Sequence, residues 1–282
     1  MRAAGPTAIR LCSALTAACL LASAPPAGAQ TYHSGQNLQP VFEGWEENPD
    51  GSFNMVFGYL NRNYEEHLNI PVGPDNHFEP GPADRGQPTY FYPRRQRVIF
   101  RVRVPADWGD KELVWTVTAH GKADRAVGWL VPEQIIDEQV IAMNRAGGGA
   151  PEMANAAPTI HIEEGLERTA SVGEALALTA VIADDGIPEM RPARNSRPPG
   201  RRNARGLRLA WIHYRGPADV AFDPWTPPME DHTPGWTPPE LPPDGRVVTT
   251  VTFTEPGTYV LRGMADDGFL YSHADVTVTV TP

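Results

Sequence analysis

Residues 252–280 read TFTEPGTYVLRGMADDGFLYSHADVTVTV. From residue 276 onward valine and threonine alternate, which is the two-residue period of a β-strand with one buried face. The Glu255-Pro256-Gly257 segment is a turn signal, and apolar residues at every second position follow it. The stretch therefore predicts two consecutive strands of an antiparallel sheet.

Similar alternation predicts strands along most of the chain. These expected strands cover residues 42–46, 52–61, 98–104, 113–117, 176–182, 207–211 and 247–253. Residues 71–93 are rich in Pro, Gly and Asp and predict an ordered loop, and helical spacing is confined to residues 133–145. We therefore expect an all-β protein of two antiparallel β-sandwich modules, residues 30–149 and 158–282, with one short helix before a linker at 150–157.

The first 29 residues have the composition of a secretory signal peptide. Arg2 and Arg10 precede an apolar stretch, residues 11–23, and Ala27-Gly28-Ala29 supplies small residues for a peptidase. We expect cleavage after Ala29 and a periplasmic or secreted protein. An alternative is lipidation at Cys19, although the preceding residues fit a lipobox less well.

Removal of this leader changes the chemistry of the chain. Both cysteines, Cys12 and Cys19, lie within it, so the mature chain can form no disulfide and no thiolate site. The leader also holds two of the 24 basic residues and none of the 34 acidic ones, which leaves a net charge of −12. That charge excludes nucleic acid as a partner, since binding to phosphates requires cations. No segment of the mature sequence is long and apolar enough to span a bilayer.

The second module resembles a known family in three segments. They are VGEALALTAVIADDG at 172–186, LRLAWIHYRGP at 207–217, and the stretch quoted first. In this order they resemble the PKD and related immunoglobulin-like domains of exported bacterial proteins. The resemblance implies that Trp211 is the core tryptophan of the third strand and that Tyr259 forms a tyrosine corner. It also implies adhesion, polysaccharide or protein binding, or spacing, without chemistry of its own.

The first module resembles segments of uncharacterised exported bacterial proteins. The resemblance rests on EGWEENPDGSFNMVFGYLNRN at 43–63 and FYPRRQRVIFRVRVP at 91–105. It implies no activity.

The tetrapeptide Ala-Asp-Asp-Gly occurs twice and predicts an acidic pole. Its aspartates are Asp184, Asp185, Asp266 and Asp267. In the family's pattern both turns leave strands at the same end of the sandwich, so the four carboxylates can approach one another and bind Ca²⁺. The alternative is that the aspartates close tight turns and extend into water. No other cofactor is predicted.

Two insertions predict a binding surface. The segment 187–206 is rich in arginine and includes Arg197, Arg201 and Arg202, while Trp225 and Trp236 each begin a Trp-Thr-Pro-Pro repeat. Arginines can contact anionic groups, and tryptophans on an extended arm can stack on sugar rings or fill a groove in a protein. The alternatives are a solvated arginine loop and tryptophans that anchor the arm to its own sandwich.

Catalytic motifs are missing from the sequence, which has no nucleophile elbow, zinc-protease motif or phosphate-binding loop. His120 and His213 lie at or near predicted strands, where a hydrogen-bonded structural histidine is the expected role. The sequence therefore predicts a non-catalytic binding or adhesion protein of the cell envelope, with a polysaccharide or a protein as its partner. The alternatives are a structural subunit or spacer that assembles with itself or a partner chain, and a hydrolase.

Overall fold

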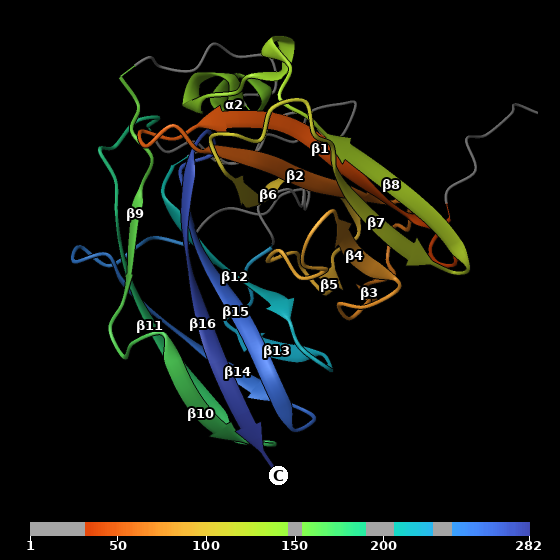
Figure 1. The fold of residues 1–282 in the computed structure, drawn as a ribbon. Coiled ribbons are helices and arrows are strands. Elements are labelled where there is room, and N and C mark those ends of the chain that lie inside the picture. Colours follow the sequence, from red (N-terminus) through yellow and green to blue (C-terminus); the bar gives the residue numbers. More distant parts are fainter. Residues whose placement is uncertain (1–31, 146–153, 190–205, 228–238) are drawn as a thin grey trace, which may run out of the picture. The chain divides into compact units, whose positions relative to one another are not determined.

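The first part of the chain forms two three-stranded antiparallel sheets, in the orders β1-β2-β6 and β4-β7-β8 (Figure 1). The computed structural model describes residues 32–145, 154–189, 206–227 and 239–282. The strands of these sheets are β1 (Leu38–Glu47), β2 (Phe53–Asn61), β4 (Asn76–Glu79), β6 (Arg94–Val104), β7 (Leu113–Ala119) and β8 (Lys122–Gly128). The predicted hairpin of β1 and β2 is confirmed, with Phe42 opposite Phe57. The predicted leader and its cleavage site lie outside the described residues.

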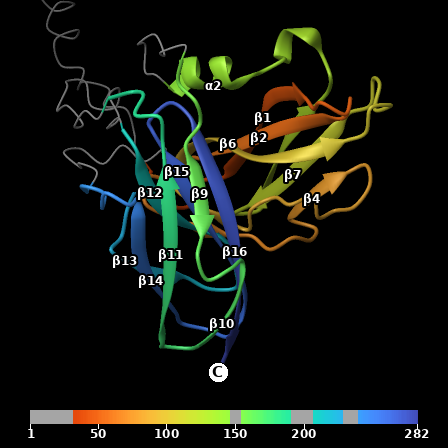
Figure 2. The same cartoon turned by 90° about the vertical axis from the view of Figure 1, so that its left-hand side faces the viewer.

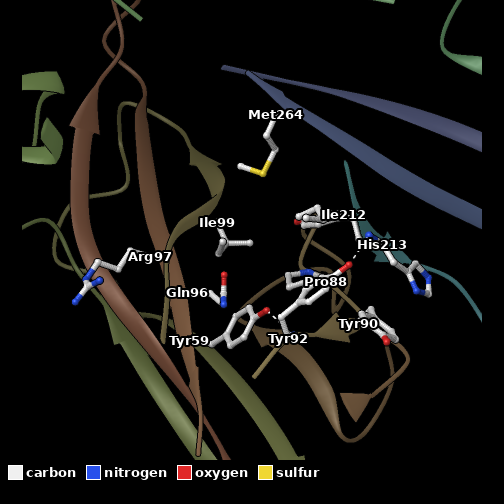
Figure 3. Close-up of a pocket in the computed structure, with 11 residues that line it drawn as sticks. Tyr59, Pro88, Tyr90, Tyr92, Gln96, Arg97, Ile99, Ile212, His213 and Met264 are labelled. Atoms are coloured by element: carbon white, nitrogen blue, oxygen red, sulfur yellow. Dashed lines mark hydrogen bonds between the residues drawn. The ribbon is translucent and has the colours of Figure 1, made fainter. Parts of the chain in front are cut away.

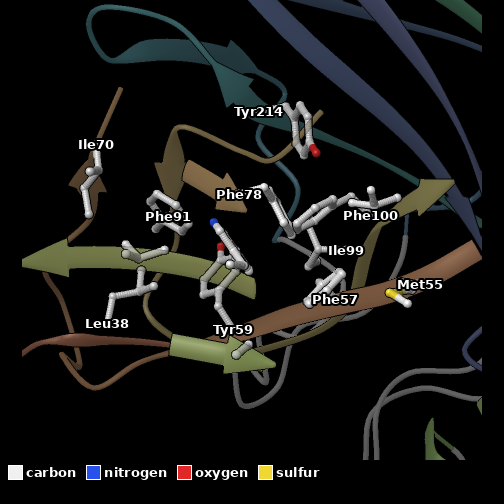
Figure 4. Packing of buried hydrophobic residues seen from close by; sticks show 14 of the residues in the cluster. Leu38, Met55, Phe57, Tyr59, Ile70, Phe78, Phe91, Ile99, Phe100 and Tyr214 are labelled. Carbon is white, nitrogen blue, oxygen red and sulfur yellow. The ribbon is translucent and has the colours of Figure 1, made fainter. Parts of the chain in front are cut away.

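An aromatic core lies within this part (Figure 4). Trp115 of β7 is fully buried, and the ring of Phe78 stacks on it with centroids 5.8 Å apart. Phe57 and Phe100 contact the same indole edge-on. Burying such rings away from water is the main favourable term of folding.

Eight strands of the second part form a sandwich of two four-stranded sheets (Figure 2). They are β9 (Thr159–Ile162), β10 (Glu167–Ser171), β11 (Ala175–Ala183), β12 (Arg208–Arg215), β13 (Val220–Asp223), β14 (Arg246–Phe253), β15 (Gly257–Asp266) and β16 (Tyr271–Thr281). One sheet has the order β13-β14-β11-β9 and the other β10-β16-β15-β12. These orders match strands D-E-B-A and A′-G-F-C of an immunoglobulin-like domain.

Two side chains confirm what the family resemblance implied. Trp211 of β12 is 3% exposed and packs in the core between the two sheets. The Tyr259 hydroxyl donates to the carbonyl of Glu255 at 2.8 Å, four residues upstream, which is the geometry of a tyrosine corner. The predicted all-β class with an immunoglobulin-like second half is therefore confirmed.

The helix is shorter than predicted. Residues 132–145 contain a 3₁₀ turn, η1 (Pro132–Gln134), and then an α-helix, α2 (Glu138–Arg145). The Ile136 N–H donates to the carbonyl of Trp45, which holds the intervening residues extended beside β1. No periodic pattern in the sequence predicts this backbone contact. None of the helices in the described ranges is long and apolar enough to cross a membrane.

Two further details differ from the sequence prediction. The expected loop at 71–93 contains β4 and β5 (Tyr90–Phe91), and β5 pairs with β3 (Leu68–Asn69). In the second part β10 runs parallel to β16, with Thr169 opposite Thr279. Parallel pairing here follows from the chain crossing from one sheet to the other after β9.

The two parts share buried surface. Ile212, Tyr214 and Met264 lie on the outer face of the second sandwich and belong to the hydrophobic core of the first part. Backbone and side-chain hydrogen bonds also cross the junction. They join Tyr92 to His213, Gly86 and Thr89 to Tyr214, Gln87 to Arg215, and Ile99 to Arg262. Tyr32–Pro282 thus form one compact unit, while the predicted domain boundaries stay a prediction.

Candidate functional site

Of the five predicted binding residues, Trp225 is the one that lies within the described residues. The other four, Trp236, Arg197, Arg201 and Arg202, lie outside the described residues. Trp225 lies two residues after the end of β13, and its side chain is 54% exposed. An indole exposed to this degree is available to an external partner.

The other described tryptophans show that this exposure is not typical of the chain. Trp45, Trp108, Trp115 and Trp211 are at most 8% exposed, and Trp129, in the first part, is 39% exposed. Pro227, two residues beyond Trp225, is buried, so the chain packs back onto the protein and holds the tryptophan at the surface.

Asp266 and Asp267 do not form an exposed acidic pole, because both are buried. Asp266 is 1% exposed and its carboxylate pairs with the Arg208 guanidinium at 3.0 Å. Asp267 is fully buried, and its Oδ1 accepts the N–H groups of Phe269 and Leu270. The turn thus packs into the protein instead of extending into water.

The other aspartate pair lies nearer to solvent. The Asp185 carboxylate accepts the N–H groups of Ala156 and Ile187. Burial and the adjacent Asp185 raise the pKa of Asp184, while burial first and then the adjacent Asp266 raise the pKa of Asp267. Within each pair, the pKa of one aspartate is thus raised by the aspartate next to it in the sequence.

The predicted calcium site gains no support from this arrangement. Within the described ranges no three or more His, Asp or Glu side chains are grouped so that they can hold a metal ion. Ca²⁺ prefers six to eight oxygen ligands, so two separated pairs of aspartates are a poor site. The calcium site stays a prediction.

A small cavity lies at the junction of the two parts (Figure 3). Its volume is about 20 Å³, which accommodates one water molecule but no organic ligand. Its walls come from β2, the segment 88–99, β12 and β15. The lining residues are Tyr59, Pro88, Tyr90, Tyr92, Gln96, Arg97, Ile99, Ile212, His213, Tyr214 and Met264.

The tyrosine hydroxyls of this cavity are used in structural hydrogen bonds. Tyr59 accepts the N–H of Tyr92 at 2.9 Å, and the Tyr92 hydroxyl accepts the N–H of His213 at 2.8 Å (Figure 3). Burial raises the pKa of both phenols, so neither supplies a phenolate at neutral pH. The Tyr59 hydroxyl links β2 to the residue after β5, the Tyr92 hydroxyl links that residue to β12, and neither is suited to proton transfer.

His213 differs from the role that the sequence predicted. It is 2% exposed and neither ring nitrogen has a hydrogen-bond partner, so the prediction of a hydrogen-bonded histidine is wrong here. The prediction is confirmed for His120, whose Nε2 lies 3.1 Å from the Glu66 carboxylate. A catalytic base needs a partner that orients it, and His213 has none. Its ring instead packs against Tyr90, with centroids 4.3 Å apart.

The buried His213 predicts a loss of stability in acid. Burial lowers the pKa of His213 from its ordinary 6.5 to about 4. The imidazole of His213 therefore binds a proton more tightly in the unfolded chain than in the folded protein. The free energy of unfolding thus keeps its full value above about pH 6.5 and falls as the pH drops toward 4. We expect up to ~3 kcal/mol of this loss to disappear in the His213→Leu variant.

Urea unfolding between pH 7.5 and pH 4.5 measures this effect. Leucine forfeits no hydrogen bond, because neither imidazole nitrogen makes one. The exposed His161 provides the control, and His161→Leu should keep the wild-type pH dependence. Equal slopes for wild type and His213→Leu would contradict the prediction.

Comparison with known proteins gives fold similarity alone. No family model matches the chain, and no curated protein matches it. Similar solved structures include a PKD domain of an M14-like peptidase from a Thermoplasmatales archaeon, with 15% identity, a TM-score of 0.25, and coverage of 45% of this chain and 96% of that one. Sidekick-1 immunoglobulin domains 1–4 have 12% identity and a TM-score of 0.25, with 88% of this chain and 51% of that chain covered.

Domains 4 and 5 of the S-layer protein SbsC are also similar, with 8% identity, a TM-score of 0.24, and coverage of 61% of this chain and 66% of theirs. At these TM-scores the similarity carries no argument about function. The strand order and the tyrosine corner are what make the second part a PKD-like, immunoglobulin-like β-sandwich.

Two buried polar residues were missed by the sequence reasoning. Arg262 is 4% exposed and forms a two-bond ion pair with Asp275, while Asn76 is fully buried beside Trp115. The first had a usable signal, because Arg262 and Asp275 are directly opposite in the β15–β16 hairpin and carry opposite charges. Asn76 had no such signal, since its partners are two backbone carbonyls and the Trp115 indole, none of them adjacent to it in the sequence.

Proposed function

We propose that the protein is an exported, non-catalytic binding protein of the cell envelope, and that it binds a polysaccharide or a protein through the surface around Trp225. The observation that carries this proposal is the 54% exposure of Trp225 beside a buried proline. An exposed indole presents a large apolar area with few rotatable bonds, which suits stacking on sugar rings or insertion into a pocket.

The short strand β13 supports this role by fixing the base of the arm. Asp223 at the end of β13 lies opposite Thr250 of β14, and the Thr250 hydroxyl donates to the Asp223 carbonyl at 3.2 Å. The backbone is therefore anchored two residues before Trp225. A partner that contacts the indole gains affinity without having to order that strand.

Replacement of Trp225 by alanine tests the proposal. We expect binding at least about 10-fold weaker for Trp225→Ala, because exposed aromatic anchors dominate such interfaces. Envelope polysaccharide and solubilised envelope proteins, immobilised separately, are the two probes, and the one that retains the wild-type protein gives the partner class.

Trp129→Ala is the matched control, since this tryptophan is also exposed but lies after β8 in the first part. It should bind like wild type, and both variants should unfold at the wild-type temperature. Wild-type affinity in Trp225→Ala would overturn the proposal, as would a wild-type protein that neither probe retains.

A further inference from the structure

An open groove in the first part of the protein is a feature that the proposed surface around Trp225 does not use. Its volume is about 420 Å³, which lies within the range of roughly 300–1,000 Å³ that small-ligand sites occupy. One wall is β3 with the loop that follows it, residues 68–75, and the other is the end of β7 with the turn after it, residues 118–120. The groove is therefore large enough for a small organic ligand, unlike the cavity at the junction.

Hydrogen bonds hold the loop of this groove in place before any ligand binds. The Ile70 carbonyl accepts Nδ2 of Asn76 at 2.9 Å, and the backbones of Gly73 and Asn76 exchange two bonds, at 3.1 and 3.0 Å. The Thr118 N–H of β7 donates to the Asp75 carbonyl at 2.8 Å, which ties the two walls together. A ligand that enters a preformed groove loses little binding free energy to the ordering of the protein.

His120 lines the groove with an imidazole that is already oriented. It lies in the turn between β7 and β8, and its Nε2 is 3.1 Å from the Glu66 carboxylate. The same carboxylate accepts the Gly35 N–H at 2.7 Å, which fixes it in turn. A carboxylate only accepts, so Nε2 carries the hydrogen, and in the neutral imidazole Nδ1 is left as an acceptor.

The other polar side chains of the groove also offer acceptors. The Asn69 Nδ2 donates to the carbonyls of Gly216 and Pro217, at 3.0 and 2.9 Å, which leaves Oδ1 as the amide atom available to a ligand. Asp75 contributes a carboxylate, which only accepts, and Thr118 contributes a hydroxyl, which donates or accepts. The groove therefore suits a ligand that is rich in hydrogen-bond donors.

The charge of the groove favours a cation over an anion. Asp75 lines it, and no lysine or arginine is among the described residues that do so. Glu66 adds a second carboxylate, in contact with His120. Lys122 lies opposite Ala119 in the same hairpin but does not line the groove. An anionic ligand would thus meet a carboxylate at the surface of the groove, whereas an ammonium group would be attracted to it.

An amino sugar matches both the charge and the acceptors. An ammonium group has three donors and no acceptor, and its bond to a carboxylate is roughly twice as strong as a bond between neutral groups. A lysine side chain would engage the carboxylate alone, but a sugar ring also presents hydroxyl donors to Asn69 and His120. The apolar side chains of Pro71, Val72 and Pro74 supply a surface for the C–H faces of the ring.

We propose that this groove is a second binding site, which takes an amino sugar with its ammonium group on the Asp75 carboxylate. Hydroxyl groups of the sugar donate to Asn69 Oδ1 and to His120 Nδ1. Glu66 is a positioning residue, because it acts on the ligand through His120. The site is separate from Trp225, so the proposed function and this proposal can fail independently.

Titration with glucosamine at pH 7 tests the proposal, followed by the NMR shifts of the backbone amides of residues 68–75 and 118–121. We expect saturable shifts that are centred on these amides. N-acetylglucosamine has the same ring without the ammonium group, and glucuronate carries a carboxylate. Both should bind at least about 10-fold more weakly, because they lose the charge-assisted hydrogen bond. Asp75→Asn should bind glucosamine only as well as wild type binds N-acetylglucosamine.

Three further variants serve as controls. Asp110→Asn removes the same charge from an exposed position outside the groove, before β7, and should bind glucosamine like wild type. A Cβ at Gly73 meets no atom within 4 Å, so Gly73→Leu should unfold at the wild-type temperature while its side chain blocks the groove. Trp225→Ala should leave glucosamine binding unchanged, which separates this site from the proposed one.

Several results would overturn the proposal. They are equal affinity for glucosamine and glucuronate, wild-type affinity in Asp75→Asn, and wild-type affinity in Gly73→Leu. Lysine amide bound as tightly as glucosamine would show recognition of an ammonium group alone and would also overturn it. So would unchanged amides of residues 68–75 at glucosamine concentrations up to about 50 mM, where even a weak site is occupied.

Discussion

Replacement of Arg262 by alanine should lower the free energy of unfolding by about 3–5 kcal/mol, toward the lower end because water reaches its partner. The Arg262 side chain is 5% exposed, and Nε and Nη2 donate to the Asp275 carboxylate at 2.6 and 2.8 Å. Nη1 donates to the Ile99 carbonyl of β6, and the guanidinium lies 3.7 Å from the centroid of the Tyr214 ring. Alanine leaves a half-buried carboxylate and a buried carbonyl without partners. Removing one member of a buried ion pair in this way costs more stability than replacing both members.

Arg246→Ala is the matched control for this prediction. Arg246 forms the same forked pair with Glu163, but both side chains are exposed to solvent. Exposed pairs contribute little, because water solvates the charges that are separated. Urea unfolding at neutral pH should show a much smaller loss for Arg246→Ala, and equal losses in the two variants would contradict the argument. Arg262→Met with Asp275→Leu should recover much of the stability.

Replacement of Asn76 by aspartate should cost about 3 kcal/mol at neutral pH, although the side chains have the same shape. The Asn76 Nδ2 donates to the carbonyls of Ile70 and Pro88, each at 2.9 Å. The Oδ1 accepts the Nε1–H of Trp115, also at 2.9 Å. Aspartate places a second acceptor against two carbonyl oxygens in a fully buried site, so attraction becomes repulsion.

The control is Asn69→Asp. Asn69 also donates to two carbonyls, those of Gly216 and Pro217, at 3.0 and 2.9 Å, but it is exposed. Water can replace those bonds, so a small loss of stability is expected. Urea unfolding again measures the free energy of unfolding. In acid the Asn76→Asp variant should lose less stability relative to wild type, because a protonated carboxyl can donate one hydrogen bond. Unchanged stability of Asn76→Asp at pH 7 would contradict the prediction.

The strands were predictable where one face of a sheet is buried. The alternation from residue 276 onward becomes β16, in which Val276, Val278 and Val280 are buried. The tyrosine corner followed from a family pattern that encodes a backbone contact only four residues away. Local sequence therefore specified both the strand and its corner.

Long-range packing was not predictable in the same way. The burial of Asp266 and Asp267 depends on the first part covering the β15–β16 loop, which is a contact between Phe269 and residues more than 170 positions earlier. The Ala-Asp-Asp-Gly sequence is the same in the exposed and the buried turn. What distinguishes the two turns is the surface that each one meets, and no local pattern records it.

The strand orders also bear on the risk that strands of different molecules pair edge to edge. A sheet edge with unpaired backbone groups can recruit strands from other molecules, and the risk grows with the length of the edge. In the second sandwich three of the four edge strands, β9, β13 and β10, have only four, four and five residues. The longest edge, β12, donates the His213 N–H to Tyr92 and accepts the Thr89 N–H at Tyr214. The eleven-residue strand β16 lies between two partners, so the most regular valine-threonine segment of the chain is kept from becoming a template for aggregation.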